Sequence, residues 1–233
     1  MKSVLITGAA QGLGRALFQL YFQKGWKVFP LVRKQKDMDE LKSLGDENCY
    51  PILADLRDED IIEKITSVLE INTDTLDVLI NNAGYVKKIE GILSMTGEDL
   101  DNHFLTNVTG AWQCARACYP FLKRNGQGII INISSRRGTF EFNINEPYKR
   151  ANAYKVTKCA LNMLSVIMDE EFSKDNIRVL PVHPGALKTR VAPPDADTLP
   201  ETAALKLYEW IQQINENTPV GLYDIINEKY LNW

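Results

Sequence analysis

The feature that most constrains the fold is a strand, a glycine-rich turn and a helix at the start of the chain. Residues 3–6 form an apolar run with branched side chains, typical of a buried strand, and helical periodicity follows over residues 15–24. This order presents backbone N–H groups and a helix N-terminus to an anion, and glycines let a pyrophosphate approach the backbone. The turn between them reads Thr7-Gly8-Ala9-Ala10-Gln11-Gly12-Leu13-Gly14. Its spacing matches neither the G-x-G-x-x-G fingerprint nor a P-loop, so it predicts a phosphate site without naming the nucleotide.

Further strand-like runs alternate with helical stretches along the rest of the chain. The runs cover residues 27–32, 50–53, 76–80, 128–133, 177–182 and 221–226. This alternation predicts an α/β fold, doubly wound, with a mainly parallel sheet and helices on both faces. No repeat or low-complexity segment interrupts it, so we expect residues 1–233 to form a single domain.

Composition excludes several classes of protein. The formal net charge is −3, without a long block of one sign, which argues against a nucleic-acid partner. No apolar run approaches the ~18 residues of a membrane span, and strand-like residues begin at Ser3, so neither a membrane segment nor a secretion signal is expected. The four cysteines are interpreted as reduced thiols of a cytoplasmic protein, and no cluster has metal-ligand spacing, so no metal is expected.

The ends of the second and third strands bear on the choice of cofactor. Dinucleotide folds that bind NAD carry an acidic residue after the second strand, and Arg33-Lys34 stands there instead. An arginine fork suits a 2′-phosphate, and Arg15 could add to it, whereas the alternative is two solvated surface charges. We therefore favour NADP(H) over NAD(H). Asp55 either bonds the adenine amine or caps a helix that starts near Asp58.

A tyrosine and a lysine four residues apart lie in a stretch with helical periodicity, residues 152–172. Tyr154 and Lys158 would therefore share one helix face. A nearby cation lowers the pKa of a tyrosine from about 10, which would let the phenol exchange a proton near neutral pH. Taken alone, such a pair is usually one packed ring and one solvated charge, so the rest of the chain must decide its role.

Five short motifs occur together in a fixed order. They are Thr7-Gly8-x3-Gly12-x-Gly14, Asn81-Asn82-Ala83-Gly84, Ser135-x2-Gly138, Tyr154-x3-Lys158 and Pro184-Gly185-x3-Thr189. In this order they resemble the short-chain dehydrogenase/reductase family over about residues 3–190. The resemblance implies a Rossmann-type fold and hydride transfer between nicotinamide and a small-molecule carbonyl or alcohol. The tail that ends at Trp233 is similar to small C-factor-like and sniffer-type carbonyl reductases.

The resemblance also implies roles for single residues. Tyr154 matches the acid/base, Lys158 the residue that lowers its pKa and bonds the nicotinamide ribose, and Asn107 the support of a proton relay. Ser135, rather than Ser134, matches the serine that bonds the reacting oxygen, because the gap to Gly138 fits the motif. Asn81 and Gly84 match the turn that lines the cofactor cleft. The full set of expected cofactor contacts is Gly8, Gln11, Gly12, Leu13, Gly14, Arg33, Asp55, Leu56, Asn82, Ala83, Gly84, Tyr154, Lys158, Pro184, Gly185 and Thr189.

Two other functions stay open from the sequence. One is a dinucleotide-binding sensor or signalling protein without turnover, and the other is an epimerase or dehydratase, for which the C-terminal region is short. The family often associates through long helices, here near residues 105–122 and 152–172, so the resemblance implies a homodimer or homotetramer.

The chain departs from the family pattern between Ser135 and Tyr154, where the gap of 19 positions is long. Residues 139–151 are interpreted as an inserted polar loop near the cleft mouth. Basic side chains within this loop and just before it could favour an anionic substrate, and the alternative is an exposed loop with solvated charges. These side chains are Arg136, Arg137, Lys149 and Arg150. We expect residues 189–199 to form a short lid. His183 lies at a strand end, but the sequence shows no partner that would give it a catalytic role.

Overall fold

The computed structural model describes residues 1–44, 47–87, 91–145, 152–189 and 196–233. Their strands form one sheet of eight in the order β3-β2-β1-β4-β5-β6-β7-β8. The strands are β1 (Ser3–Thr7), β2 (Lys27–Val32), β3 (Ile52–Leu53), β4 (Val78–Asn81), β5 (Ile129–Ile133), β6 (Arg178–His183), β7 (Tyr223–Asp224) and β8 (Lys229–Tyr230). All neighbours pair in parallel except β7 and β8, which confirms the expected mainly parallel sheet.

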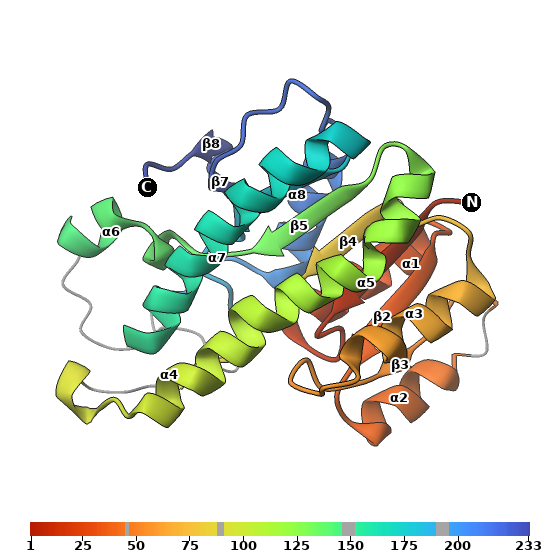
Figure 1. Cartoon of the computed structure of the whole chain (residues 1–233), viewed down its shortest axis with the longest axis horizontal. Coiled ribbons are helices and arrows are strands. Elements are labelled where there is room, and N and C mark those ends of the chain that lie inside the picture. The colour runs from red at the N-terminus through yellow and green to blue at the C-terminus, as the bar shows by residue number, and fades with distance from the viewer. Residues whose placement is uncertain (45–46, 88–90, 146–151, 190–195) are drawn as a thin grey trace.

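Helices cover both faces of this sheet, and Figure 1 shows α5 and α7 crossing in front of the strands. The α-helices are α1 (Gly12–Gln23), α2 (Gln35–Lys42), α3 (Ile61–Asn72), α4 (Gly97–Phe104), α5 (Gly110–Asn125), α6 (Phe140–Asn145), α7 (Asn152–Phe172) and α8 (Pro200–Ile211). Shorter helical turns are η1 (Ile92–Ser94), η2 (Leu105–Thr109), η3 (Arg136–Gly138) and η4 (Ser173–Asp175). No helix in these ranges is long and apolar enough to cross a membrane.

The sheet separates two apolar cores. Val4 and Ile6 of β1 pack on the side of α1 and α8, whereas Leu5 packs on the side of α3, α5 and α7. Because both faces are covered, the inner strands read as continuous apolar runs rather than as alternating ones. Each large apolar side chain buried in this way stabilises the fold by about 1.5–3 kcal/mol. The two cores hold the carboxyl ends of the inner strands at one rigid edge.

Several boundaries differ from those expected. The helix after Asp55 begins at Ile61, not near Asp58. The long helical stretch predicted over residues 105–122 begins with η2, a π-helical segment between α4 and α5. Helix α2 and strand β8 were not expected, because their apolar content is low and they depend on packing against the rest of the fold.

The stretch at residues 139–151, expected to be a loop, contains the helix α6. Its start is held by Thr139, whose hydroxyl accepts from the Phe142 N–H at 3.3 Å. The Asn143 amide donates to the carbonyls of Arg137 and Thr139, both at 2.7 Å. These local bonds replace the solvation that a polar loop would use. Lys149 and Arg150 lie outside the described residues, as do residues 190–195 of the expected lid.

Candidate active site

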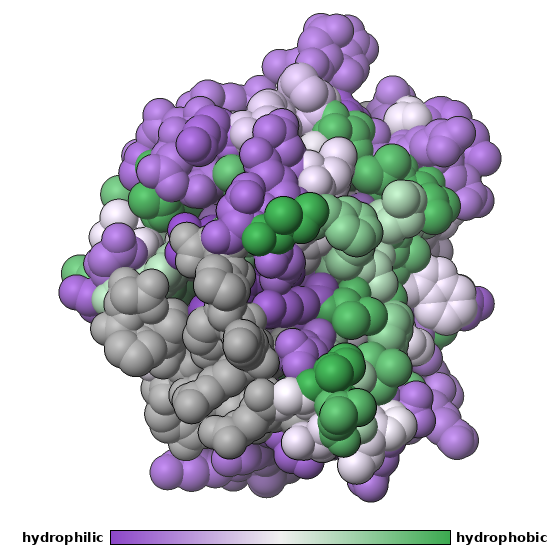
Figure 2. All heavy atoms as spheres, turned by 90° about the vertical axis from the view of Figure 1, so that its left-hand side faces the viewer, coloured by the Kyte–Doolittle hydropathy of each residue, from purple (hydrophilic) through white to green (hydrophobic). Residues whose placement is uncertain are grey.

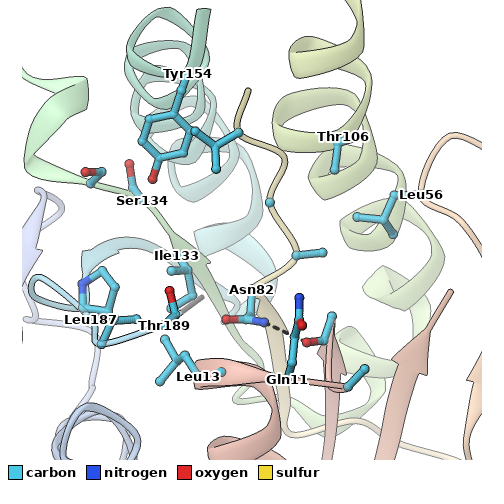
Figure 3. A pocket seen from close by; sticks show the side chains of 18 of the residues that line it. Gln11, Leu13, Leu56, Asn82, Thr106, Ile133, Ser134, Tyr154, Leu187 and Thr189 are labelled. Atoms are coloured by element: carbon cyan, nitrogen blue, oxygen red, sulfur yellow. Dashed lines mark hydrogen bonds between the residues drawn. The ribbon is translucent and has the colours of Figure 1, made fainter. Parts of the chain in front are cut away.

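A cavity of about 740 Å³ opens at the carboxyl ends of the parallel strands. Residues from the turns after β1, β2, β3, β4, β5 and β6 line it, as expected where a doubly wound sheet binds its ligand. Figure 3 shows Tyr154 reaching into it from its helix, with Gln11 and Leu13 on the opposite side. Most predicted site residues line this cavity: Gly8, Gln11, Gly12, Leu13, Arg33, Asp55, Leu56, Asn82, Ala83, Gly84, Ser135, Tyr154, Lys158, Pro184, Gly185 and Thr189.

The glycine-rich turn forms one wall of the cavity. Gly8 and Gly12 have φ values of 68° and 56°, in the left-handed region that favours glycine. Gly14 does not line the cavity. A Cβ atom there would lie 2.2 Å from the Gly8 carbonyl oxygen and 2.5 Å from Nδ2 of Asn82, so Gly14 serves close packing of α1 beneath the turn. The N–H groups of Gly8 and Ala9 donate to the Leu31 carbonyl at 3.0 and 3.2 Å, so the part of the turn that can face a phosphate is the start of α1 at Gly12.

The turns after β1 and β4 are joined by Thr7, whose role the sequence did not reveal. Its hydroxyl oxygen accepts from the backbone N–H groups of Asn82 and Ala83, both at 3.0 Å. The Asn82 amide donates back to the Thr7 carbonyl at 2.9 Å. Asn81, expected in the cleft lining, lies beneath it instead, because its amide donates to the Ala111 carbonyl and to Oδ1 of Asn132.

The wall after β2 carries positive charge. Arg33 lines the cavity with a side chain that is 62% exposed, and its guanidinium lies 3.9 Å from the Asp55 carboxylate. Hydrogen bonds from Arg57 hold the pKa of Asp55 below its usual value. Arg15, expected to help Arg33, is not a lining residue, because it pairs with Glu40 at 2.7 Å. Lys34 lines the wall in its place.

Tyr154 and Lys158 occupy one face of α7, as their spacing predicts. The Lys158 ammonium lies 5.5 Å from the centroid of the Tyr154 ring and donates to the Ile133 carbonyl at 2.6 Å. Burial lowers the pKa of Lys158 to about 8. The two groups therefore share a small volume at the inner wall of the cavity.

The pKa of Tyr154 is raised by burial, which differs from the lowering expected from Lys158. Hydrogen bonding with Ser135 and the charge of Arg137 each lower this pKa and offset part of the rise. The Lys158 ammonium is directed to the Ile133 carbonyl, and burial of the phenol outweighs the effects that lower the pKa of Tyr154. Arg137, in the turn after β5, is therefore a cation that lowers the pKa of the Tyr154 phenol.

That turn fixes the serines relative to α7. Both serines line the cavity, but the Ser134 hydroxyl donates to Asn162, whereas the Ser135 hydroxyl accepts from the Arg137 N–H at 3.2 Å. A Cβ at Gly138 would lie 2.6 Å from the Lys158 carbonyl carbon, so only glycine lets the turn contact the helix this closely. The close contact explains why the S-x2-G and Y-x3-K motifs occur together.

Asn107 lies within η2 and is 1% exposed. Its side-chain oxygen accepts from the Tyr85 N–H at 2.6 Å, and its amide donates to the Tyr85 carbonyl and to the Thr157 hydroxyl, both at 3.0 Å. Asn107 does not line the cavity. Its side chain instead ties the chain after β4 to helix α7, one turn from Tyr154. π-Helical insertions of this kind occur frequently at functional sites.

The turn after β6 closes the remaining side of the cavity. Gly185 has a φ of 88°, and a Cβ there would lie 2.9 Å from the Thr198 hydroxyl oxygen. The Lys188 N–H donates to the Thr198 carbonyl at 2.8 Å, which fastens this turn to the far side of the expected lid. Leu187 and Lys188 also line the cavity, although neither belongs to a sequence motif.

The fold and the site define a class: a doubly wound α/β protein with a dinucleotide-shaped cradle and a Ser-Tyr-Lys wall. A comparison with protein families makes this specific, because the model described as short chain dehydrogenase matches residues 2–199. The chain therefore belongs to the short chain dehydrogenase family and is an oxidoreductase of that kind.

Individual relatives agree with this assignment. The NADP-dependent 3-hydroxy acid dehydrogenase YdfG of Escherichia coli K12 is 31% identical over 182 residues, covering 78% of this chain and 71% of that protein. The NADPH-bound carbonyl reductase from chicken fatty liver is 26% identical with a TM-score of 0.89, covering 100% of this chain and 99% of that one. The carbonyl reductase Sniffer of D. melanogaster is 25% identical with a TM-score of 0.90 and full coverage of both chains, 100% each. The relatives whose names state a cofactor use NADP.

Proposed function

We propose that this protein is an NADP-preferring oxidoreductase that interconverts a carbonyl and an alcohol, with Tyr154 as the acid/base. The observation that carries the proposal is that Ser135, Tyr154 and Lys158 line the same cavity as the glycine-rich turn. A protein that only binds a dinucleotide has no use for this trio. NADP-dependent dehydrogenases and carbonyl reductases among its relatives support the same reading.

The cofactor would lie along the wall built from the turns after β1, β2 and β4. Gly12, at the N-terminus of α1, would offer its backbone N–H to the phosphates, whereas the Gly8 N–H already donates to the Leu31 carbonyl at 3.0 Å. Arg33 with Lys34 would supply the charge that a 2′-phosphate needs. When bound, the cofactor supplies or accepts the hydride. The protein contributes orientation, exclusion of water and control of one proton.

The proton is handled at the Tyr154 hydroxyl, which donates it to the reacting oxygen during reduction. Ser135 donates a second hydrogen bond to that oxygen, which stabilises the charge that develops there. Lys158 would bond the nicotinamide ribose, and the positive charge of its ammonium near pH 7 would favour the phenolate form of Tyr154. Asn107 supports proton exchange indirectly, because its side-chain groups already bond to Tyr85 and Thr157.

A fluorescence titration with NADPH, run beside one with NADH, tests the cofactor side. Oxidation of bound NADPH by a panel of carbonyl compounds then tests the reaction. We expect tighter binding of NADPH and turnover with at least one compound. Binding without turnover across a broad panel would favour the sensor, and binding of neither nucleotide would contradict the whole proposal.

We propose a homodimer or homotetramer that forms through α5 and α7, because both present apolar side chains to solvent. Figure 2 shows apolar side chains gathered in a band on one face of the molecule. Exposed apolar residues on these two helices are Trp112, Val156, Met163 and Ile167.

We also propose that residues 1–233 act as one domain in the cytoplasm, in keeping with Cys114, Cys118 and Cys159, which form no disulfide within the described structure.

A further inference from the structure

The charges that line the cavity are distributed unevenly between its two ends. At the end formed by β2 and β3, the cations face carboxylates: Asp37 and Asp55 line that wall. At the end formed by β5, α7 and β6, no carboxylate of the described structure lines the cavity, although Arg136 and Arg137 do. The second end is the one that holds Ser135 and Tyr154. Positive charge without acidic lining therefore surrounds the reacting position.

Arg136 is held in place by the helix that follows it. Its guanidinium lies 4.9 Å from the ring centroid of Phe142 in α6, a cation–π arrangement. Its carbonyl accepts from the Thr139 hydroxyl at 2.9 Å and from the Thr139 N–H at 3.1 Å, which fixes the backbone. No carboxylate among the described residues forms an ion pair with Arg136. The planar fork of an arginine suits a carboxylate in two-point contact.

His183 lies near the same end of the cavity, and it is buried there. It is 5% exposed, lines the cavity, and its Nδ1 atom is buried without a hydrogen-bond partner in the described part of the chain. Burial, together with the charges of Arg136 and Arg137, lowers its pKa to about 4, against the opposing effect of Asp224. His183 is therefore neutral near pH 7, and it adds no positive charge beside Arg136.

We propose that the substrate carries a carboxylate, and that Arg136, with Arg137 beside it, binds this group while the carbonyl lies at Ser135 and Tyr154. The substrate class is thus an oxo acid and the corresponding hydroxy acid. This inference rests on the proposed function and adds a specificity-determining residue, Arg136, to it. It also gives α6 a role, because Phe142 of that helix positions the arginine.

The test compares acids with their neutral methyl esters: pyruvate, acetoacetate and levulinate, each beside its ester, with NADPH as reductant. The esters carry the more electrophilic carbonyl, so a preference for the acids would oppose intrinsic reactivity. We expect kcat/KM to favour at least one acid by tenfold or more. Arg136→Leu should remove that preference, mainly through KM, and leave the ester within about twofold. Arg136→Lys should retain part of it, because the charge stays and the fork is lost.

Arg124→Leu is the matched control, because the Arg124 guanidinium also lies over a phenylalanine ring, 4.5 Å from the Phe121 centroid, and does not line the cavity. It should leave both kinetic constants unchanged. Equal kcat/KM for acid and ester, or an equal loss of both in Arg136→Leu, would overturn the inference and leave the proposed function intact. Failure to reduce any carbonyl, charged or neutral, would instead contradict the proposed function.

A binding measurement decides the inference even without turnover. Calorimetric titration of acetoacetate and of methyl acetoacetate into the protein with NADP⁺ present forms a complex that cannot react, because both partners are oxidised. We expect the acid to bind at least tenfold more tightly than the ester in the natural protein, and equally in Arg136→Leu. The same affinity for acid and ester in the natural protein would overturn the inference.

Discussion

The turns after β1 and β5 both follow inner strands of the sheet, but they line the cavity with different chemical groups. Each follows a buried parallel strand and opens onto the cavity. The β1 turn is built on glycines and offers its backbone, whereas the β5 turn offers hydroxyl and guanidinium side chains of Ser135, Arg136 and Arg137. The pyrophosphate is common to NAD(H) and NADP(H), so backbone donors are sufficient to bind it. A substrate differs between relatives, so its wall is made of side chains that can be exchanged.

The largest expected effect is a loss of turnover without a loss of cofactor binding, which distinguishes the β5 side of the cavity from the β1 side. Tyr154→Phe removes the proton donor from the β5 side and leaves the β1 side untouched. We expect kcat to fall by about 10²–10⁴-fold, the usual contribution of general acid–base catalysis, with NADPH affinity retained. Tyr230→Phe, which removes only a hydroxyl that donates to the Pro219 carbonyl, is the control. Near-normal turnover in Tyr154→Phe would remove Tyr154 from its proposed role.

Lys158 lies between the two sides, and its burial makes stability depend on pH. Its pKa of about 8 in the folded protein is below the ordinary 10.5, so the folded state loses this proton before the unfolded state does. Below pH 8 both states carry the charge and the folded state bears its burial cost. Between these two pKa values the unfolded state binds more protons, so stability rises with pH.

Lys158→Met should lack this rise. The free energy of unfolding of the natural protein, relative to the variant, should therefore increase by about 3 kcal/mol from pH 7 to above pH 10. Urea denaturation of both proteins at each pH measures the difference, and subtraction cancels the titration of other tyrosines and cysteines. A difference that does not change with pH would mean that the ammonium is not buried in solution.

Gly14→Ala changes only the packing of the glycine-rich turn after β1. The added methyl group would lie 2.2 Å from the Gly8 carbonyl oxygen, so the turn must move. We expect a loss of about 1–3 kcal/mol in stability, as for other overpacked sites, together with weaker NADPH binding. Gly97→Ala is the control, because a Cβ there meets nothing within 4 Å. Thermal unfolding and NADPH titration measure both effects, and unchanged values in Gly14→Ala would show that the turn is not packed as described.

The smallest expected effect concerns the preference of the cofactor wall for NADPH over NADH. Arg33→Ala should weaken NADPH binding by about tenfold and leave NADH binding nearly unchanged, because a charge-assisted bond to a 2′-phosphate contributes roughly 1.5 kcal/mol or more. Arg15→Ala should change neither, since Arg15 pairs with Glu40 away from the cavity. Fluorescence titrations with both nucleotides give the ratio. An equal loss for NADPH and NADH would show that Arg33 contacts a group common to both.

The sequence by itself determined the alternation of inner strands and main helices, the glycine-rich turn and the shared helix face of Tyr154 and Lys158, but not α2, α6 or β8. These are local properties. A glycine at positive φ, an apolar run and an i,i+4 spacing act over a few residues, so their consequences follow from the sequence without knowledge of the distant chain. The motif residue Gly138 belongs here too, although its reason, contact with α7, appears only in three dimensions.

Tertiary structure alone decided where side chains point and what they bond. Arg15 forms an ion pair with Glu40, and Asn107 forms hydrogen bonds with Tyr85 and Thr157. Burial raises the pKa of Tyr154, where a lowering was expected. Each outcome depends on groups far away in the sequence and on the loss of water around them. Desolvation and long-range pairing are properties of the packed molecule, and no pattern along the chain encodes them locally.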